Sequence, residues 1–334
     1  MRILLLGLIL ASLCVPAVAQ ADARVSAFYY PWYETAGHDG VYAHWSQRGH
    51  APPDDIASTY YPARGLYSSA DSLVVAAQMD EIRGAGIGEL DVSWWGRGSQ
   101  EDVRLPLILA DARADGITVA AHIEPYEVRT VAGVVDDVAY LRGLGIRTVY
   151  VYRAFDLPVV EWAAARDALH QGGMTLFAQT ALAGAAAAAH FDGLYTYDIV
   201  TYRGSIFRRL CDEAHAQHLL CAPSVGPGYD ARRGSGDPVV RPRRHGGTYD
   251  AMWRAAISAH ADRVTITSYN EWHEGTQLEP AAPGRRRGRY RYLCYDGAWG
   301  VYGVRAEFAY LNRTRYWADV FASTSAEQPR TRAA

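Results

Sequence analysis

The sequence predicts an α/β protein folded as a single (β/α)8 barrel. Short apolar runs rich in β-branched residues alternate with longer runs of helical character. Gly86, Gly116, Gly145 and Gly173 each fall between the end of a predicted helix and the next strand, where a helix C-terminus favours glycine. Aromatic and polar residues gather where the predicted strands end, as expected for the ligand-binding face of a barrel.

The elements follow one another in a regular order. The predicted strands are residues 25–30, 88–94, 118–122, 148–152, 175–179, 193–196, 219–223 and 264–268, and the predicted helices are residues 69–84, 102–115, 132–144, 159–171, 181–190, 202–217, 248–261 and 305–321. A doubly wound sheet would show the same alternation. Against it, the first strand runs into Tyr29-Tyr30-Pro31-Trp32-Tyr33 and not into a Gly-x-Gly-x-x-Gly loop.

Composition excludes some classes of protein. The chain has 334 residues, of which 49% are hydrophobic and 21% charged, and its net charge is −3. No basic field suggests nucleic acid or an anionic membrane as a partner. Tyr (23) and Trp (9) outnumber Phe (7), and their apolar faces with hydrogen-bonding tips suit sugar rings.

The N-terminus resembles a secretory signal. A charged start and the apolar run at 3–10 precede Ala17-Val18-Ala19, a cleavage-site pattern, so residues 1–20 are predicted to be removed. We then expect a secreted or periplasmic monomer without a stable membrane anchor, with a catalytic domain at 21–325 and a disordered tail at 326–334. Of the cysteines left, Cys211 and Cys221 either pair or are small buried hydrophobes, and Cys294 makes the count odd.

The segment 268–280 carries the candidate catalytic pair. Glu271 and Glu274, with Glu279 further on, follow a β-branched strand and stand beside Trp272 and His273. Residues three apart face the same side in a helical turn or tight loop, so both carboxylates can point into the barrel mouth. Like charges at close range raise the pKa of one member, which supplies a proton donor and a proton acceptor. The alternative is a solvated acidic loop.

Other strand ends supply candidate binding residues. His122, Glu124 and Tyr126 alternate along the third strand and would form a polar wall, or else a satisfied polar layer inside the barrel. Four tryptophans map to the same end and are candidates for stacking on sugar faces, with plain packing as the alternative: Trp32, Trp94, Trp95 and Trp272.

Sequence motifs for metal binding and for a serine nucleophile are absent. We find no His-Glu-x-x-His, no calcium loop and no zinc-spaced cysteine pair, so we expect no metal and no cofactor. Gly-x-Ser-x-Gly is also absent. The runs at 234–236, 241–245 and 285–287 are interpreted as solvated excursions, with an anionic surface as the other possibility for the basic ones.

The motifs resemble glycoside hydrolase family 99, the endo-α-1,2-mannosidases and endo-α-1,2-mannanases. The resemblance spans nearly the whole mature chain and is most specific at Asn-Glu-Trp-His-Glu-Gly-Thr-Gln. It is carried by Tyr29-Tyr30-Pro31-Trp32-Tyr33, His122-Ile123-Glu124-Pro125-Tyr126, residues 191–197, residues 223–229, residues 268–279 and the closing helix at 310–321.

The resemblance implies a barrel that cuts inside α-mannosyl chains with retention of configuration. Glu274 matches the general acid/base, and Glu271 matches the carboxylate that deprotonates the substrate's own 2-hydroxyl, giving a 1,2-anhydro sugar that water opens. Trp94 matches a stacking platform. The predicted substrate-binding residues are Tyr30, Trp32, Trp94, His122, Glu124, Tyr126, Tyr195, Tyr197, Tyr229, Asn270, Trp272 and His273.

Two other functions stay open at this stage. One is a glycan-binding barrel without activity, although both acids are present. The other is a polysaccharide-assembly protein of a related barrel group, in which Ala is expected at the position of His273. The stretch 230–245 matches no family motif, which leaves the preference for the leaving group undecided.

Overall fold

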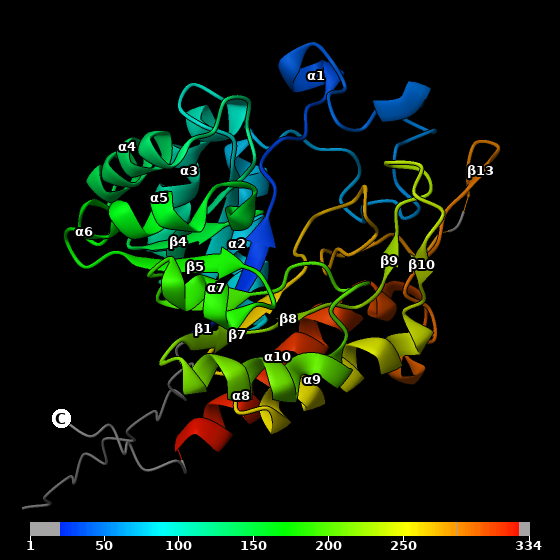
Figure 1. Ribbon diagram of the computed structural model, residues 1–334. Helices are drawn as coiled ribbons and strands as arrows, with labels where there is room; N and C mark the ends of the chain where they lie inside the picture. Colours follow the sequence, from blue (N-terminus) through cyan, green and yellow to red (C-terminus); the bar gives the residue numbers. More distant parts are fainter. Residues whose placement is uncertain (1–20, 285, 327–334) are drawn as a thin grey trace, which may run out of the picture.

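The computed structural model describes residues 21–284 and 286–326 (Figure 1). The predicted signal at 1–20 lies outside the described residues, as does 327–334 of the predicted tail. Ala326, the first residue of that predicted tail, is instead the last residue of a helix, α10 (Ala309–Ala326). Among the described residues, no helix is both long and apolar enough to cross a membrane.

A parallel sheet forms the centre of the molecule, with the strand order β7-β6-β5-β4-β3-β2-β1-β11-β8. Its strands are β1 (Asp22–Tyr29), β2 (Ile87–Trp94), β3 (Thr118–Ile123), β4 (Thr148–Val151), β5 (Thr175–Gln179), β6 (Gly193–Tyr195), β7 (Leu220–Ala222), β8 (Ser224–Val225) and β11 (Val264–Ile266). The two outermost strands, β7 and β8, are halves of one extended segment separated by Pro223, which has no N–H to donate. The sheet therefore closes on itself, and the predicted barrel is confirmed.

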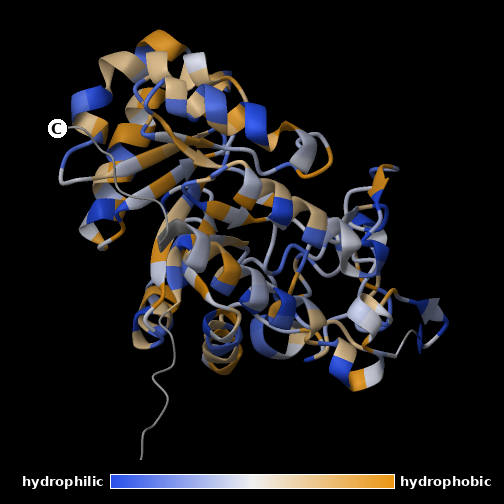
Figure 2. Ribbon diagram, turned by 90° about the horizontal axis from the view of Figure 1, so that it is seen from below, coloured by the Kyte–Doolittle hydropathy of each residue, from blue (hydrophilic) through white to orange (hydrophobic). Residues whose placement is uncertain are grey.

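Helices cover the outside of the barrel. They are α2 (Ser72–Gly84), α3 (Gln100–Ala114), α4 (Val131–Gly143), α5 (Val159–Ala164), α6 (Arg166–Leu169), α7 (Ala183–Ala188), α8 (Phe207–Ala216), α9 (Gly247–Ser258) and α10. Figure 2 shows hydrophilic and hydrophobic residues alternating along these helices, as expected where one face packs on the sheet. In Figure 1, α8, α9 and α10 lie side by side.

The sequence explains where the longer helices begin. Asp71, Ser99 and Thr130 precede α2, α3 and α4, and each side chain accepts a hydrogen bond from a backbone N–H of the first turn. The single helix predicted at 159–171 is divided into α5 and α6. The predicted start of the last helix at 305 is wrong, because residues 303–306 form a 3₁₀ turn, η6 (Gly303–Ala306), before α10.

The loops contain short helices and two short β-hairpins. They are α1 (Ala36–Asp39), η1 (Gln47–Gly49), η2 (Ala154–Asp156), η3 (Gly204–Ile206), η4 (Arg244–Gly246), η5 (Ala298–Gly300), and the two hairpins β9 (Tyr229–Asp230) with β10 (Val240–Arg241) and β12 (Arg286–Arg287) with β13 (Tyr290–Arg291). The β9–β10 hairpin stands at the edge of the barrel mouth in Figure 1.

The inside of the barrel is packed with aromatic side chains. Phe28, Tyr150, Phe177 and Tyr195 are fully buried there. Gly193 makes room for Phe177, because a Cβ at this position would lie 2.4 Å from the Phe177 ring. The interior is therefore a core and not a pore.

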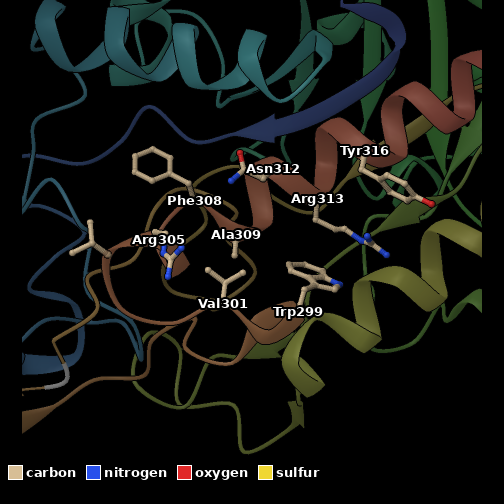
Figure 3. A pocket seen from close by; sticks show the side chains of 9 residues that line it. Trp299, Val301, Arg305, Phe308, Ala309, Asn312, Arg313 and Tyr316 are labelled. Carbon is tan, nitrogen blue, oxygen red and sulfur yellow. The ribbon is translucent and has the colours of Figure 1, made fainter.

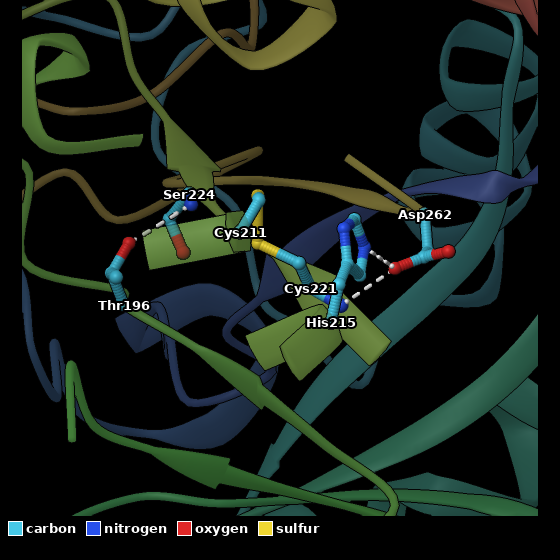
Figure 4. The surroundings of a disulfide bond; sticks show 6 residues. All are labelled: Thr196, Cys211, His215, Cys221, Ser224 and Asp262. Carbon is cyan, nitrogen blue, oxygen red and sulfur yellow. Dashed lines mark hydrogen bonds and ion pairs between the residues drawn. A yellow bond between two sulfur atoms is a disulfide. The ribbon is translucent and has the colours of Figure 1, made fainter. Parts of the chain in front are cut away.

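Cys211 of α8 and Cys221 of β7 form a disulfide with an S–S distance of 2.02 Å (Figure 4). Of the two possibilities left open by the sequence, a disulfide or two separate buried thiols, the disulfide is therefore the one formed. Asp262 ties the same region together, since it accepts hydrogen bonds from the Cys221 N–H at 2.8 Å and from Nε2 of His215 at 2.9 Å.

Candidate active site

A short hydrogen-bonded loop after β11 presents the two candidate catalytic acids. Ser268 links the two ends of this loop. Its Oγ accepts a hydrogen bond from the Glu271 N–H at 2.8 Å and lies 2.9 Å from Thr276 Oγ1. Its backbone N–H donates to the Thr276 carbonyl. Gly275 follows Glu274 with φ +63°, a backbone conformation that favours glycine. This loop is a tight turn, as predicted. Glu271 and Glu279 are buried and Glu274 is half-buried, so the alternative of a solvated acidic loop is wrong.

Glu274 is held from the β6 side of the barrel. The phenol of Tyr197 donates a 3.1 Å hydrogen bond to Glu274 Oε2, and the phenol of Tyr30 donates to Tyr197 at 2.6 Å. Tyr197 has φ +52°, and two hydroxyls fix its backbone: Ser224 Oγ accepts its N–H, and Thr267 Oγ1 donates to its carbonyl. The phenol is therefore positioned before any substrate arrives.

Burial and charge divide the roles of the two acids. Burial, and next the negative charge of Glu271, raise the pKa of Glu274 to about 8, while the Tyr197 hydrogen bond opposes the shift. Asp198 and Glu124 add smaller contributions in the same direction as Glu271. A carboxyl group with this pKa is protonated at neutral pH, which suits a general acid.

Glu271 is fixed by His273. The His273 N–H donates to Glu271 Oε1 at 2.9 Å, and the imidazole Nδ1 lies 3.1 Å from the same oxygen. Nε2 of His273 is 2.7 Å from the carbonyl oxygen of His44, which holds the ring from its other side. The carboxylate thus has a defined orientation, as a base acting on a substrate hydroxyl requires.

Glu274 borders a cavity of about 350 Å³ at the barrel mouth. The wall is made of Tyr152, Tyr197, Asp198, Ile199, Val200, Thr201, Tyr229, Asp237, Val239, Thr267 and Glu274. The phenol of Tyr229 donates to Asp237 at 2.8 Å, which ties β9 to the loop before β10. Two of the predicted binding residues, Tyr197 and Tyr229, lie in this wall.

His122 and Glu124, two members of the predicted polar wall of β3, contact buried neighbours, as in the alternative of a satisfied polar layer. His122 Nε2 lies 2.8 Å from the Tyr195 phenol, and its Nδ1 lies 3.0 Å from Glu124 Oε1 without hydrogen-bond geometry. Ser93 donates to Glu124 at 2.8 Å. His122 and Tyr195 are buried, so they support the floor of the mouth, and their predicted contact with substrate stays a prediction.

Trp94 does not face the mouth, contrary to the prediction. Side chains alternate along a strand, so Ser93 points into the barrel and Trp94 points out. Trp94 is fully buried between helices: its N–H donates to Asp102 of α3 at 2.9 Å, and its ring stacks on Tyr140 of α4. A stacking role for Trp94 is therefore wrong.

Two further predicted binding residues hydrogen-bond to carboxylates of the protein itself. Tyr126 hydrogen-bonds the Asp137 carboxylate on α4, because the chain leaves the strand direction after Ile123. Trp272 is fully buried and donates to Glu279 at 2.8 Å. Glu279 itself is an ion-pair partner of Arg64 and has no exposed surface, so both are structural residues of the loop.

Asn270 joins the first strand to the catalytic loop. Its Oδ1 accepts the Tyr30 N–H at 2.7 Å, and its Nδ2 donates to the Tyr30 carbonyl at 3.0 Å. Asn270 is completely buried and aligns Tyr30, and its predicted contact with substrate stays a prediction. Trp32 stacks on His44 with ring centroids 4.6 Å apart, beside Tyr30.

Sequence reasoning missed Tyr152, and it named Trp95 only as one of four candidate stacking tryptophans. Trp95, and not Trp94, is the tryptophan with an exposed face (37% exposed), and its N–H donates to Ser93 at 3.2 Å beside Glu124. The two-residue period from Ser93 was the available signal. Tyr152 lines the cavity next to Glu274, on the same face as the buried Tyr150.

The basic run at 241–245 is a solvated excursion only in part, because Arg243 is buried. Arg243 is buried in a box of Tyr60, Tyr295 and Tyr310, with its guanidinium 4.6–4.7 Å from each ring centre. It donates to the carbonyl of Gly275 at 2.9 Å and to that of Gln277 at 2.7 Å. Arg243 therefore anchors the loop directly after Glu274.

The remaining predicted excursions differ among themselves. Gly234 packs on the catalytic loop, since a Cβ there would lie 2.3 Å from the His273 carbonyl oxygen. Arg286 and Arg287 are exposed in β12, as predicted, and residue 285 lies outside the described residues. In the described part of the chain, no cluster of three or more His, Cys, Asp or Glu is arranged to hold a metal ion.

A closed (β/α)8 barrel with two neighbouring carboxyl groups at its mouth defines a glycoside-hydrolase type of site. The model of the family described as glycosyl hydrolase family 99 matches residues 20–323. The chain belongs to this family and is a glycoside hydrolase, so the resemblance seen in the sequence is confirmed.

Relatives and solved structures agree with this assignment. The chain is 31% identical to mouse glycoprotein endo-alpha-1,2-mannosidase, over 89% of this chain and 74% of that protein. It is 32% identical to the human glycoprotein endo-alpha-1,2-mannosidase-like protein, over 88% and 75%. The structure of the GH99 endo-alpha-mannosidase from Bacteroides thetaiotaomicron matches with a TM-score of 0.80 and 30% identity, over 91% of this chain and 99% of that one.

Proposed function

We propose that this glycoside hydrolase is an endo-acting α-mannosidase that cleaves internal α-1,2-mannosidic linkages with retention of configuration. The single observation that carries the proposal is the asymmetry of the acid pair. Burial and the nearby charge of Glu271 raise the pKa of Glu274 to about 8, whereas Glu271 is oriented by His273. The relatives named as α-mannosidases support the sugar and the linkage.

The proposed first step uses the substrate's own 2-hydroxyl as the nucleophile. Glu271 removes the proton from this hydroxyl, its oxygen attacks the anomeric carbon, and the bond to the leaving oxygen breaks. Glu274 gives its proton to that leaving oxygen, aided by burial that keeps it protonated. In an α-mannoside the axial 2-hydroxyl lies trans to the leaving group, so the attack is in line.

Water then opens the 1,2-anhydro sugar in the proposed second step. Glu274, now ionised, accepts a proton from the water, the water oxygen bonds the anomeric carbon, and Glu271 returns its proton to the 2-oxygen. Two inversions at the anomeric carbon give overall retention. In this scheme the Tyr197 phenol stabilises the ionised form of Glu274 between the two steps.

The proposal also includes the cellular location, the oligomeric state and the partners of the enzyme. The disulfide between Cys211 and Cys221 supports secretion or periplasmic export, because such bonds persist in oxidising compartments. We infer that the protein acts as a monomer, without a metal, a nucleic acid partner or a stable membrane anchor, on a mannan or an N-glycan-type mannoside. His273 beside Glu271 favours the hydrolase over a polysaccharide-assembly protein.

The test is incubation of an α-1,2-linked manno-oligosaccharide with the wild type, Glu271→Gln and Glu274→Gln. We expect the wild type to release an internal fragment whose new reducing end is first seen by NMR as the α anomer. Both variants should bind the oligosaccharide without cleaving it. Glu213→Gln, on the exposed surface of α8, is the matched control. Full activity in either active-site variant, or a β product, would refute the mechanism, and binding without turnover by the wild type would favour a glycan-binding protein.

A further inference from the structure

The basic run at 241–245 is divided by the fold, and part of it is not explained by the proposed function. Arg243 turns inward to anchor the catalytic loop, whereas Arg241 and Arg244 turn to another side. They meet Arg203, from the loop before α8, around a cavity of about 420 Å³. We call this cavity the arginine pocket; its wall is Arg203, Val240, Arg241, Pro242, Arg244, Gly247, Thr248 and Ala251.

The arginines of this pocket lack acidic partners. In the described part of the chain none of the three takes part in an ion pair, in contrast to Arg233 with Asp55 and Arg313 with Asp250. Burial, then the charges of Arg203 and Arg244, lower the pKa of Arg241, and Asp198 opposes the shift only weakly. Three like charges therefore face one cavity without an ion-pair partner, an arrangement that favours a bound anion.

Backbone contacts hold two of the arginines in place. Arg241 donates to the Ile199 carbonyl through Nη1, and Arg203 donates to the Val200 carbonyl through Nε at 3.2 Å. Thr248 Oγ1 donates to the Pro242 carbonyl at 2.7 Å, which fixes the chain between Arg241 and Arg244. The α9 helix begins at Gly247 in the pocket wall, and its dipole adds positive potential there.

The pocket lies directly behind the cavity that borders Glu274. Val239 lines the active-site cavity, and the next residue, Val240, lines the arginine pocket. The loop 198–201 likewise separates the two, because Ile199 and Val200 line the first and bind the arginines of the second. The two cavities therefore share a wall, which places the arginine pocket next to the cavity that borders Glu274.

We propose that the arginine pocket binds a phosphate group carried by the glycan on the leaving-group side of the cut. A phosphomonoester has about −1.5 to −2 charges and three acceptor oxygens, which matches several guanidinium forks better than a single carboxylate does. The placement relative to the cut rests on the proposed function, in which Glu274 protonates the leaving oxygen. The binding of phosphate itself does not depend on it.

The first experiment measures binding by calorimetry, with the phosphomonoester of methyl α-mannoside, methyl α-mannoside and inorganic phosphate as probes. We expect saturable binding of the phosphomonoester, weaker binding of inorganic phosphate and none of the neutral mannoside in this pocket. The double variant Arg203→Gln/Arg244→Gln changes two exposed side chains and should weaken phosphomonoester binding at least roughly tenfold, because hydrogen bonds to charged groups are lost. Arg208→Gln/Arg209→Gln on α8 removes the same charge and is the matched control.

The second experiment measures cleavage of a phosphorylated mannan before and after phosphatase treatment. The wild type should prefer the phosphorylated form, and Arg203→Gln/Arg244→Gln should lose this preference while cleaving the neutral mannan at the wild-type rate. Absence of saturable phosphomonoester binding, an equal loss in the α8 control, or inorganic phosphate binding as tightly as the phosphomonoester would overturn the proposal. Phosphomonoester binding without any mannan cleavage would refute the proposed function and leave the phosphate site standing.

Discussion

The phenol of Tyr197 donates a 3.1 Å hydrogen bond to Glu274, the carboxyl group that the barrel keeps protonated at neutral pH. Tyr197 needs a left-handed backbone conformation to reach this position, and hydroxyls from β8 and the end of β11 stabilise that conformation. The proton donor is thus oriented by residues of several strands and not by its own loop alone.

Replacing Tyr197 with Phe should shift the pH dependence of activity. The hydrogen bond lowers the pKa of Glu274, so its loss raises this pKa further above about 8. Because the acid acts in its protonated form, the high-pH decline of kcat/KM should move to higher pH, while kcat at neutral pH falls roughly tenfold through poorer orientation. The measurement is a pH–rate profile on an α-1,2-mannoside. Tyr152→Phe, which alters the same cavity, is the control, and an unmoved high-pH limb in Tyr197→Phe would contradict the assignment.

Glu274→Gln should make the fold less sensitive to alkaline pH. The pKa of Glu274 is raised from 4.5 to about 8 in the folded protein, so the folded state binds more protons than the unfolded state between these values. This contribution to stability is fully present below about pH 4.5 and is lost as pH rises through about 8. Thermal unfolding over this window should show the variant gaining on the wild type as pH increases. A variant curve parallel to the wild type, as expected for Glu213→Gln, would argue against a buried protonated Glu274.

Arg243→Met should damage both stability and catalysis. The substitution removes the hydrogen bonds to the Gly275 and Gln277 carbonyls and the cation–π contacts, at a cost of about 3 kcal/mol in unfolding free energy. Because Gly275 follows Glu274, we expect a fall in kcat with a smaller change in KM. Urea unfolding and steady-state kinetics measure the two effects. Arg232→Met, at an exposed arginine of the same stretch, should change neither by much. Equal effects of the two substitutions would show that the aromatic box is dispensable.

The disulfide should stabilise the barrel without contributing to the chemistry. Cys211 and Cys221 are 10 residues apart, and closing a loop of this size contributes about 3 kcal/mol to the unfolding free energy in the chain-entropy model. Cys211→Ala/Cys221→Ala should therefore unfold at lower urea concentration and retain the wild-type kcat at low temperature. Mass spectrometry before and after reduction checks that the bond is present. Loss of kcat in a folded double variant would mean that the α8–β7 junction matters for the site.

Much of the fold follows from local patterns. Hydrophobic periodicity and glycine positions are properties of short segments, so strands such as β5 and helices such as α2 were predicted within a few residues. The division of residues 159–171 into α5 and α6 had no comparable signal. The pairing of Cys211 with Cys221 also stayed open, because sequence spacing does not give the distance between two sulfur atoms in space.

Some features of the candidate site also follow from the sequence, and others follow only from the tertiary structure. By itself the sequence determined that Glu271 and Glu274 stand together after a buried strand, because residue types at close spacing stay close in any fold. Only the tertiary structure decided that Trp94 turns outward to Asp102 and that Arg243 turns inward to Tyr310. The physical reason is that a long side chain takes the direction in which its polar atoms and its ring find partners. Those partners lie on elements far away in the sequence, so they exist only once the barrel has closed.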